Sequence, residues 1–524
     1  MKNLKKMVSF LLALVMVLAM GTTVFAASST HTITIANSAT GHTYEAYQIF
    51  SGDVETVNGS KVLSNIVWGN GVTEAGQKAL GDAAEKAKTI TTEEGAAAFA
   101  KEVAAYLTNP VASVESTGLY TISGLSDGYY LVKDQDNSLK TEDDFYTAYM
   151  MKVVGDNVTA QPKGDKPSLD KQIKHNESDR WDVVGDNQIG DTVEFRTITT
   201  IPDTSKYDEY DYTIYDTMSK GLTSNVKATS DVSIKINDSE GNGTVLSTDY
   251  YTVTVDASNA NKFTIKVDVL KAVKDGVLKA GDSIYSYYTA LLNKDALIYD
   301  EGKQDNVAYL EYSNNPNDNT GKGKTPEKKV YDWTFKMQVN KVDEAAKDLN
   351  GAKFVLSEVG TLKVADMKCN DEGTPTVTDK LIGMVKVSDG VYRIATSEDA
   401  ASSIVYTVDA GKPVIKGLDD KTKYYLYETK APAGYNLLAD PVEFEIFASY
   451  NTDGSEVAKD YPNVVVGKEA ASTTLSTNVI NKSGSVLPET GGMGTTIFYV
   501  IGGILVVCAG IVLITRKRMS KNAK

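Results

Sequence analysis

Two apolar segments, one at each end of the 524-residue chain, constrain where the rest can fold. Three lysines precede an apolar run from Met7 to Met20, and small residues lead up to Ala26. This order predicts an export signal over residues 1–26, and it fits better than an uncleaved anchor because the run is short. A second apolar run, followed by Arg516-Lys517-Arg518, predicts a membrane-spanning helix over residues 495–515 and a cytoplasmic basic tail over 516–524. Everything between them is expected outside the membrane.

The composition of the exported part is that of folded domains. Hydrophobic residues make up 42% of the chain and charged residues 23%, and the formal net charge of -15 argues against nucleic acid as a partner. There are two cysteines, Cys369 and Cys508, and the second lies in the membrane run. A disulfide between them is not expected, so covalent reinforcement would need other side chains.

Short segments of alternating polarity predict a mainly β fold, built from tandem immunoglobulin-like β-sandwich domains. We expect an N-terminal domain over residues 27–167 with a helical insertion at about 73–107, a middle domain over 168–326 and a C-terminal domain over 327–485. A segment rich in proline and lysine around Pro162 and the polar run 313–325 mark the two boundaries. Similar stretches at 122–131 and 415–426 indicate that the first and third domains arose by duplication.

Several polar side chains fall on faces that should be buried. Lys341 shares strand parity with Val339, and Lys171 lies between Leu169 and Ile173. The same parity places Asn481 and Asn306 inward, although the other face of the strand at 306–310 is nearly as apolar. Buried lysine is rare. The ordinary alternatives remain open, namely lysines that extend to solvent at a strand edge and asparagines that serve in turns.

A buried lysine and asparagine can condense to an amide if the amine is neutral and an acid polarises the carboxamide. Burial lowers the pKa of a lysine and raises that of a carboxylic acid. Glu428 lies among aromatic residues in the third domain, and Asp216 shares parity with Tyr212 and Ile214 in the second. These two acids are the candidates for that role.

The stretch Leu487-Pro488-Glu489-Thr490-Gly491 lies just before the membrane run. Extended, proline-stiffened chain held near a membrane is well placed for a transpeptidase. A second motif, YxLxETxAPxGY, is met by Tyr424, Leu426, Glu428, Thr429, Ala431, Pro432, Gly434 and Tyr435. With both motifs, over nearly its whole length, the chain resembles the major (backbone) pilins that sortases assemble on Gram-positive bacteria, and this resemblance implies Cna-B-like domains.

The resemblance also implies site residues. A pilin-class sortase would cleave between Thr490 and Gly491 of the LPXTG motif and transfer Thr490 to a lysine of the next subunit. The segment from Val158 to Lys163 matches the family's lysine motif, with Gln161 where tyrosine is usual, and Lys166 is the alternative lysine.

Two intramolecular isopeptide bonds are implied as well. The family pattern joins Lys171 to Asn306 with help from Asp216, and Lys341 to Asn481 with help from Glu428. The opening strand of the first domain, residues 31–36, contains no lysine, so no such bond is expected there.

The expected function is that of the major structural subunit of a covalent cell-surface pilus (fimbrium) that supports cell adhesion and is linked to the cell wall, with a membrane-anchored precursor. The implied partners are pilin-class and housekeeping sortases, other copies of the chain, peptidoglycan, accessory pilins and host-surface ligands. No cofactor or metal is expected, and the three histidines form no catalytic cluster, so the chain is not expected to be an enzyme. The alternative hypothesis is a monomeric wall-anchored adhesin with the same stalk domains.

Overall fold

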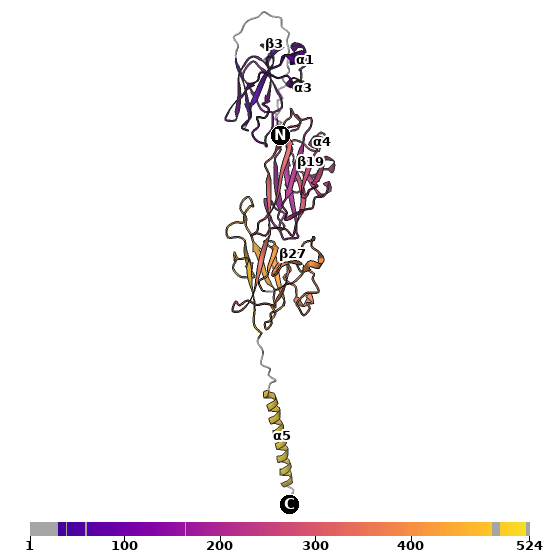
Figure 1. The fold of residues 1–524 in the computed structure, drawn as a ribbon, viewed down its shortest axis with the longest axis vertical. Helices are drawn as coiled ribbons and strands as arrows, with labels where there is room; N and C mark the ends of the chain where they lie inside the picture. The colour runs from indigo at the N-terminus through magenta and orange to yellow at the C-terminus, as the bar shows by residue number, and fades with distance from the viewer. Residues whose placement is uncertain are drawn as a thin grey trace, which may run out of the picture.

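The computed structural model describes residues 30–37, 39–57, 60–162, 164–409, 411–484 and 493–519. Three β domains follow one another along the long axis of the molecule, and a helix comes last (Figure 1). The predicted fold class, mainly β with tandem sandwich domains and a C-terminal apolar helix, is therefore confirmed.

The first domain is a sandwich of two sheets with strand orders β5-β6-β1-β9 and β3-β2-β7-β8, the latter also joined by β4. Its strands are β1 (His31–Ala36), β2 (Tyr44–Val57), β3 (Ser60–Trp68), β4 (Val111–Ala112), β5 (Val114–Ser116), β6 (Leu119–Leu125), β7 (Gly128–Asp134), β8 (Met150–Val154) and β9 (Val158–Ala160). Strand β8 begins only at Met150, and the backbone amides of Tyr146 and Tyr149 before it bond to the second domain.

The helical insertion of the first domain consists of α1 (Glu74–Leu80), α2 (Ala83–Lys88) and α3 (Glu93–Ala104). Each begins at a residue whose side chain accepts from a backbone N–H of the first turn, namely Thr73, Asp82 and Thr92. The apolar side of α3 packs through Phe99 on Phe50 of β2, with their rings stacked 5.5 Å apart. Side-chain capping and the apolar face of α3 thus explain why the chain forms helices at the predicted helical insertion, at about 73–107.

The second domain pairs the sheet β11-β10-β13-β20-β16-β17 with the sheet β12-β23-β21-β14-β19-β18. Its elements are β10 (Leu169–Lys174), β11 (Trp181–Asp182), β12 (Val184–Asp186), β13 (Thr192–Thr200), β14 (Tyr212–Met218), β15 (Leu222–Ser224), β16 (Ser233–Ile236), β17 (Thr244–Val245), β18 (Tyr251–Asp256), β19 (Asn259–Val267), α4 (Val269–Lys274), β20 (Ser283–Leu292), β21 (Gln304–Ser313), β22 (Lys322–Lys324) and β23 (Lys328–Trp333).

The third domain pairs the sheet β28-β26-β27-β30-β24-β34 with the sheet β29-β25-β31-β32-β33. Its strands are β24 (Phe335–Asp343), β25 (Lys353–Ser357), β26 (Met384–Ser388), β27 (Val391–Ile394), β28 (Ile404–Val405), β29 (Val408–Asp409), β30 (Val414–Leu418), β31 (Lys423–Lys430), β32 (Val442–Phe447), β33 (Asn463–Val466) and β34 (Ser476–Asn481). The first and last strands, β24 and β34, run parallel and adjacent.

The division between the second and third domains lies later than the sequence suggested. Strand β23 pairs with β21 and β12 of the second domain, so residues 328–333 belong to that domain and not to the third. The polar run 313–325 is not a linker between them, because it includes β22 and continues the same sheet. We therefore place the boundary at Thr334.

The first and third domains share a strand pairing that fits a duplication. In each, the opening strand pairs in parallel with the last strand and antiparallel with the strand of the repeated stretch: β1 with β9 and β6, and β24 with β34 and β30. The chain then crosses to the opposite sheet through β7 or β31. The similar stretches at 122–131 and 415–426 therefore correspond to the point where the chain crosses from one sheet to the other.

The first and second domains are joined by backbone as well as side-chain contacts. The amide of Tyr146 donates to the carbonyl of Asn314 over 2.8 Å, and Asn317 bonds to the backbone of Thr147 and Tyr149. A 2.6 Å ion pair joins Lys101 of α3 to Asp208, so the helical insertion also touches the second domain.

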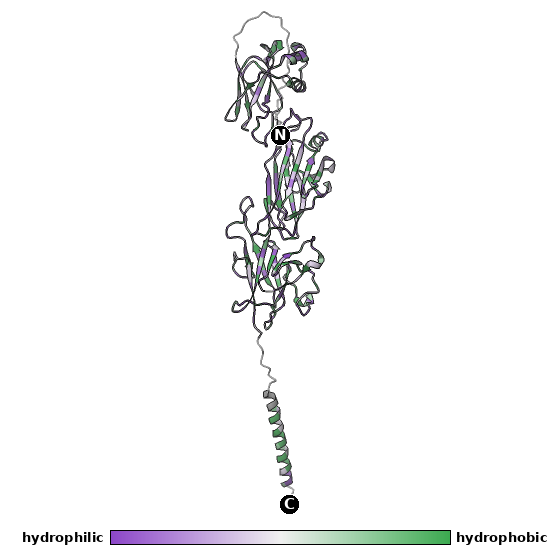
Figure 2. Cartoon of the chain, in the orientation of Figure 1, coloured by the Kyte–Doolittle hydropathy of each residue, from purple (hydrophilic) through white to green (hydrophobic). Residues whose placement is uncertain are grey.

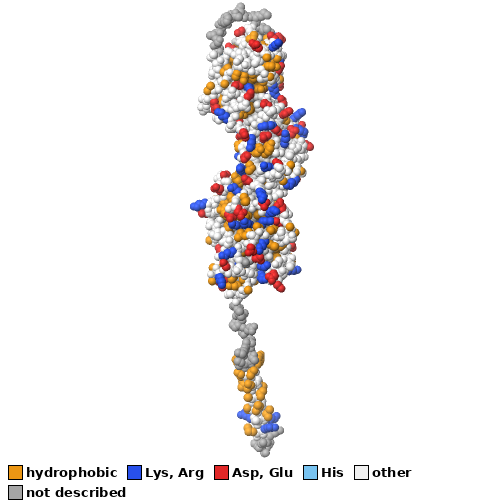
Figure 3. All heavy atoms as spheres, in the orientation of Figure 1, with side chains coloured by type: hydrophobic (Ala, Val, Ile, Leu, Met, Phe, Trp, Pro, Cys, Tyr) orange, Lys and Arg blue, Asp and Glu red, His pale blue; other side chains and the backbone are white. Residues whose placement is uncertain are grey.

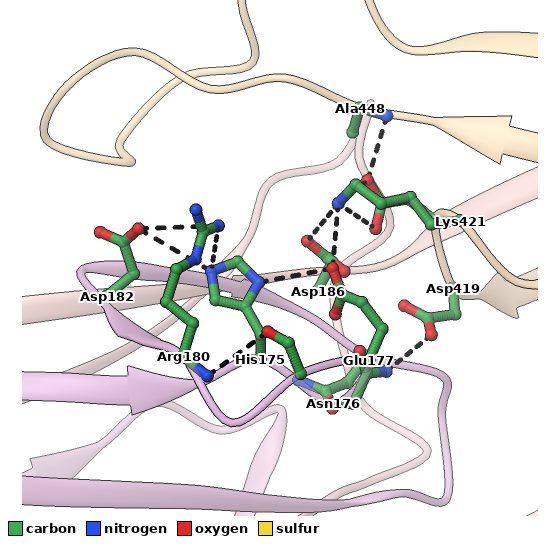
Figure 4. A network of polar contacts seen from close by, with 12 residues as sticks. His175, Asn176, Glu177, Arg180, Asp182, Asp186, Asp419, Lys421 and Ala448 are labelled. Atoms are coloured by element: carbon green, nitrogen blue, oxygen red, sulfur yellow. Dashed lines mark hydrogen bonds and ion pairs between the residues drawn. The ribbon is translucent and has the colours of Figure 1, made fainter. Parts of the chain in front are cut away.

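The joint between the second and third domains is rich in buried acids (Figure 4). Asp186 and Asp420 lie with Glu177 close enough to share a metal ion, but the ammonium of Lys421 lies 3.9, 3.0 and 3.2 Å from them. Although burial opposes it, Asp186 and Asp420 raise the pKa of Lys421. Asn176 also donates to Asp419 over 2.6 Å. Lys421 of the third domain thus places its positive charge among the acids of this cluster.

The helix α5 (Met493–Met519) differs from the domains in its surface. Within its stretch Phe498–Met519, an 18-residue window has a mean hydropathy of 2.6, and the helix is long and apolar enough to cross a membrane. Figure 2 shows hydrophobic residues along this helix, and Figure 3 shows basic side chains near its end, whereas charges of both signs cover the visible face of the domains. The helix matches the predicted membrane segment.

The buried carboxyl group of Asp332, near the end of β23, allows the energetic cost of a buried charge in the second domain to be measured. Burial raises its pKa to about 7, against a hydrogen bond from Asn187. Because the unfolded pKa is lower, ionisation in the folded state costs stability as the pH rises above about 4. We expect Asp332→Asn to stabilise the protein by about 4 kcal/mol at pH 8 and not at all below about pH 4. Thermal unfolding at both pH values measures this.

The control is Asp305→Asn, a half-buried aspartate on the neighbouring strand β21, which should leave the melting temperature unchanged at both pH values. Equal melting of Asp332→Asn and the wild type at pH 8 would contradict the predicted cost.

Candidate functional site

A buried cluster in the third domain joins Lys341 and Asn481. Lys341 lies on β24 and Asn481 on the parallel neighbour β34, and both side chains are fully buried. The Lys341 ammonium donates to the carboxamide oxygen of Asn481, and over 2.8 Å to the carbonyl of Val479. Burial lowers the pKa of Lys341, although Glu428 opposes this effect. The two predicted residues are therefore in direct contact.

Glu428 completes this cluster from the opposite sheet. It lies on β31, and its Oε1 is 3.6 Å from the Lys341 nitrogen. Its Oε2 accepts from the Asn481 amide nitrogen over 2.9 Å and from the backbone of Leu438 over 2.9 Å. One carboxylate thus contacts both the amine and the nitrogen that would leave if an amide formed.

The loop after β31 covers the cluster and explains the second sequence motif. Tyr435 donates from its backbone to the carbonyl of Pro432, and Gly434 has φ of +85°, a conformation that favours glycine. The carbonyl of Asn436 accepts from the Asn481 side chain over 2.8 Å. The motif therefore shapes a turn that closes over the asparagine.

The second domain holds a related cluster with a different arrangement. The ammonium of Lys171 on β10 lies 2.6 Å from Asp216 Oδ2 on β14 and also donates to the hydroxyl of Tyr288 on β20. The same hydroxyl donates to Asp216 Oδ2. Burial lowers the pKa of Lys171, with Asp216 acting in the opposite direction.

Asn306 faces this cluster from β21, with Gln304, Ala308 and Leu310 on the same buried side of the strand. Both polar atoms of its carboxamide are buried, and within the described part of the chain neither has a hydrogen-bond partner. The sequence left open which face of this strand points inward, and the structure places Asn306 on the buried face.

Tyr288 was missed by the sequence analysis. The alternation of β20 would have placed it inward with Ile284 and Ala290, but tyrosine is common in this chain, with 30 residues. What distinguishes Tyr288 is its position opposite Lys171 and Asp216, which depends on how the two sheets face each other.

The predicted linkage residues lie mostly outside the described residues. Lys163 and the motif from Leu487 through Pro488, Glu489 and Thr490 to Gly491 are among these. The alternative lysine, Lys166, is described: its ammonium donates to the carbonyl of Asp143 over 2.7 Å and lies 3.2 Å from its carboxylate.

Comparisons with known proteins agree with this architecture. Residues 335–460 match the family model "SpaA: Prealbumin-like fold domain". The chain is 28% identical over 292 residues to the fimbrial subunit type 1 of Actinomyces viscosus, a match that covers 52% of this chain and spans about half, 50%, of that protein.

Two solved structures are similar over most of the chain. The T6 backbone pilin of serotype M6 Streptococcus pyogenes, described as a modular three-domain structure, matches with a TM-score of 0.51 at 16% identity, covering 88% of this chain and 100% of that one. The full-length major pilin SpaD from Corynebacterium diphtheriae matches with a TM-score of 0.48 at 18% identity, over 87% of this chain and 98% of that one. The chain therefore contains a SpaA-type prealbumin-like domain and has the modular fold of a Gram-positive backbone pilin.

Proposed function

We propose that this chain is the repeating structural subunit of a covalent cell-surface pilus, and that two of its domains are closed by Lys–Asn isopeptide bonds. The observation that carries the proposal is the contact between Lys341 and Asn481, with Glu428 touching both. A lysine, an amide and an acid at one buried point favour amide formation over a structural ion pair, because a simple ion pair would need no asparagine there.

The reaction in the third domain follows from these contacts. The neutral amine of Lys341 attacks the carboxamide carbon of Asn481, the new carbon–nitrogen bond forms, and the bond to Nδ2 breaks. The Nδ2 group takes up the proton released by the amine and leaves as ammonia. Glu428 contacts Nδ2 and can pass that proton on. The step occurs once per molecule, so the chain acts on itself and is a structural protein.

The bond would change how force crosses the domain. Lys341 and Asn481 lie 140 residues apart, on the first and last strands of the domain. A pull on both ends would enter β24, cross the amide and leave through β34, bypassing the strands between. Separation of the parallel pair would then require breaking a covalent bond.

At the level of assembly, a pilin-class sortase would join Thr490 of one copy to Lys163 of the next, and a housekeeping sortase would link the pilus to peptidoglycan. The fixed position of Lys166, which is held by Asp143, supports Lys163 as the acceptor. The apolar helix α5 would hold the precursor in the membrane until transfer. Adhesion, with accessory pilins or host ligands as partners, is the role proposed for the assembled fibre.

Intact mass tests the two bonds. The signal-processed full-length chain, purified from cells that lack sortase, should be lighter than its sequence by two ammonia molecules, about 17 Da each. The Glu428→Ala variant should show the mass loss of only one ammonia molecule, because the bond in the third domain would not form. Its free energy of unfolding should be about 5 kcal/mol lower than that of the wild type, which is the loop-closure value for a cross-link between Lys341 and Asn481. Mass spectrometry and thermal unfolding measure both effects.

The matched control is Glu443→Ala, which removes an exposed glutamate paired with Lys423 on the neighbouring strand. It should retain both mass losses. A wild-type chain with the full sequence mass would refute the isopeptide bonds.

Polymerisation distinguishes a pilin from a monomeric wall-anchored adhesin. Cell-wall extracts from cells with sortase should contain a ladder of high-mass species, which Lys163→Ala should abolish because the acceptor amine is gone. Lys166→Ala is the control and should leave the ladder intact. A ladder that persists in Lys163→Ala and disappears in Lys166→Ala would move the linkage to Lys166, and its absence in the wild type would favour the adhesin.

A further inference from the structure

The hydroxyl of Tyr288 lies at the centre of the second-domain cluster. It accepts from Lys171 and donates to Asp216. Its ring stacks on Phe195, with centroids 6.0 Å apart, and meets Phe263 edge to face, with centroids 5.1 Å apart. The side chain is almost fully buried. A buried tyrosine needs one hydrogen-bond partner for its hydroxyl, whereas this one contacts both charged groups of the site.

The second domain lacks the direct contact that links acid and amide in the third. There Glu428 accepts from the carboxamide of Asn481. In the second domain Asp216 Oδ2 is taken by Lys171 and Tyr288, and neither Oδ1 nor the Asn306 carboxamide has a partner among the described residues. No direct hydrogen bond therefore joins the acid to the amide in this domain.

The sheets explain this difference. In the third domain the lysine and asparagine lie on neighbouring strands of one sheet, and the acid reaches them from the other. In the second domain Lys171 and Tyr288 come from one sheet, while Asp216 and Asn306 lie on neighbouring strands of the other. The amine must therefore react across the interior of the sandwich, where Tyr288 lies.

We propose that the Tyr288 hydroxyl is a fourth catalytic residue of the second domain, relaying a proton between Lys171, Asp216 and the Asn306 carboxamide. The inference rests on the isopeptide reaction of the proposed function. A phenol can accept one proton and donate another at the same time, which suits it to this position.

The proton balance is as follows. The Lys171 ammonium gives a proton to the Tyr288 oxygen while the phenol proton moves to Asp216, which leaves a neutral amine, an unchanged phenol and a carboxylic acid. The amine then bonds to the Asn306 carboxamide carbon, the carbon–Nδ2 bond breaks, and ammonia leaves with the amine's second proton. Asp216 returns its proton through the phenol, so ammonium is released and the tyrosine is regenerated.

The electrostatics of the site are consistent with a relay that is not consumed. Burial and Asp216 raise the pKa of Tyr288 well above its usual value, while the neighbouring Asn306 carboxamide lowers it. The phenol therefore stays protonated at rest. Burial also lowers the pKa of Lys171, which favours release of its proton.

The test compares the two bonds within one molecule. Full-length chains are labelled in a short pulse, and tryptic mapping follows the cross-linked peptides that contain Lys171 with Asn306, and Lys341 with Asn481. In Tyr288→Phe we expect the first bond to form at least about 100-fold more slowly and the second at the wild-type rate. Tyr212→Phe, which removes another buried, hydrogen-bonded hydroxyl of the same domain, should change neither.

Two further measurements separate chemistry from misfolding. Asn306→Ala cannot form the bond, so its protease resistance gives the behaviour of a folded, unlinked domain, which Tyr288→Phe should match. Incorporation of 3-fluorotyrosine keeps every hydroxyl but makes the phenol more acidic, and it should alter the rate of the first bond alone.

The outcomes distinguish the relay from the reaction it serves. If the wild type forms both bonds and Tyr288→Phe forms the first at the same rate, or if fluorotyrosine leaves that rate unchanged, the relay is overturned while the proposed function stands. If the wild type forms neither bond, both proposals fall together.

Discussion

The interior position of two lysines is the constraint on which the rest of the structure depends. Removing an ammonium from water costs several kcal/mol, and a neighbouring carboxylate recovers this only when the geometry is good. Lys341 and Lys171 are buried with one acid each, Glu428 and Asp216. Amide formation would remove the ammonium charge from the interior altogether and leave a neutral amide in its place. The cost of burial would thus favour the reaction that ends it.

Sheet topology decides which groups can meet at each lysine. Because β24 and β34 pair directly in parallel, with no strand between them in the sheet, Lys341 and Asn481 are in contact although they lie 140 positions apart in the sequence. The first domain has the same pairing of β1 with β9, but Ile33 and Ile35 fill the inward positions there. The same framework therefore holds a packed apolar core in one domain and a buried contact between a lysine and an asparagine in the other.

Local periodicity predicted one part of the site and not another. Strand alternation is a property of neighbouring residues, so it was enough to place Lys341 and Asn481 inward. Tyr288 could not be assigned in this way, because its role depends on Lys171, 117 residues away on the same sheet, and on Asp216 of the opposite sheet. Likewise the polar run 313–325 has the composition of a linker, yet Asn314 and Asn317 bond to the first domain. A polar composition indicates that a segment lies at the surface of its own domain. It does not reveal that another domain packs against that surface, as the first domain does here.

The proposed covalent closure of the second and third domains would leave the joints between domains as the remaining weak points under load. At the second joint the chain passes directly from Trp333 to Phe335, and Lys421 holds acids of both domains around one ammonium. Partly buried ion pairs are screened by salt less than exposed ones, so this joint should keep its geometry across ionic strengths. A single covalent connection then carries the tension, and the Lys421 network resists bending about it. Under this proposal the covalently closed domains would provide strength along the axis, and the joints would provide stiffness across it.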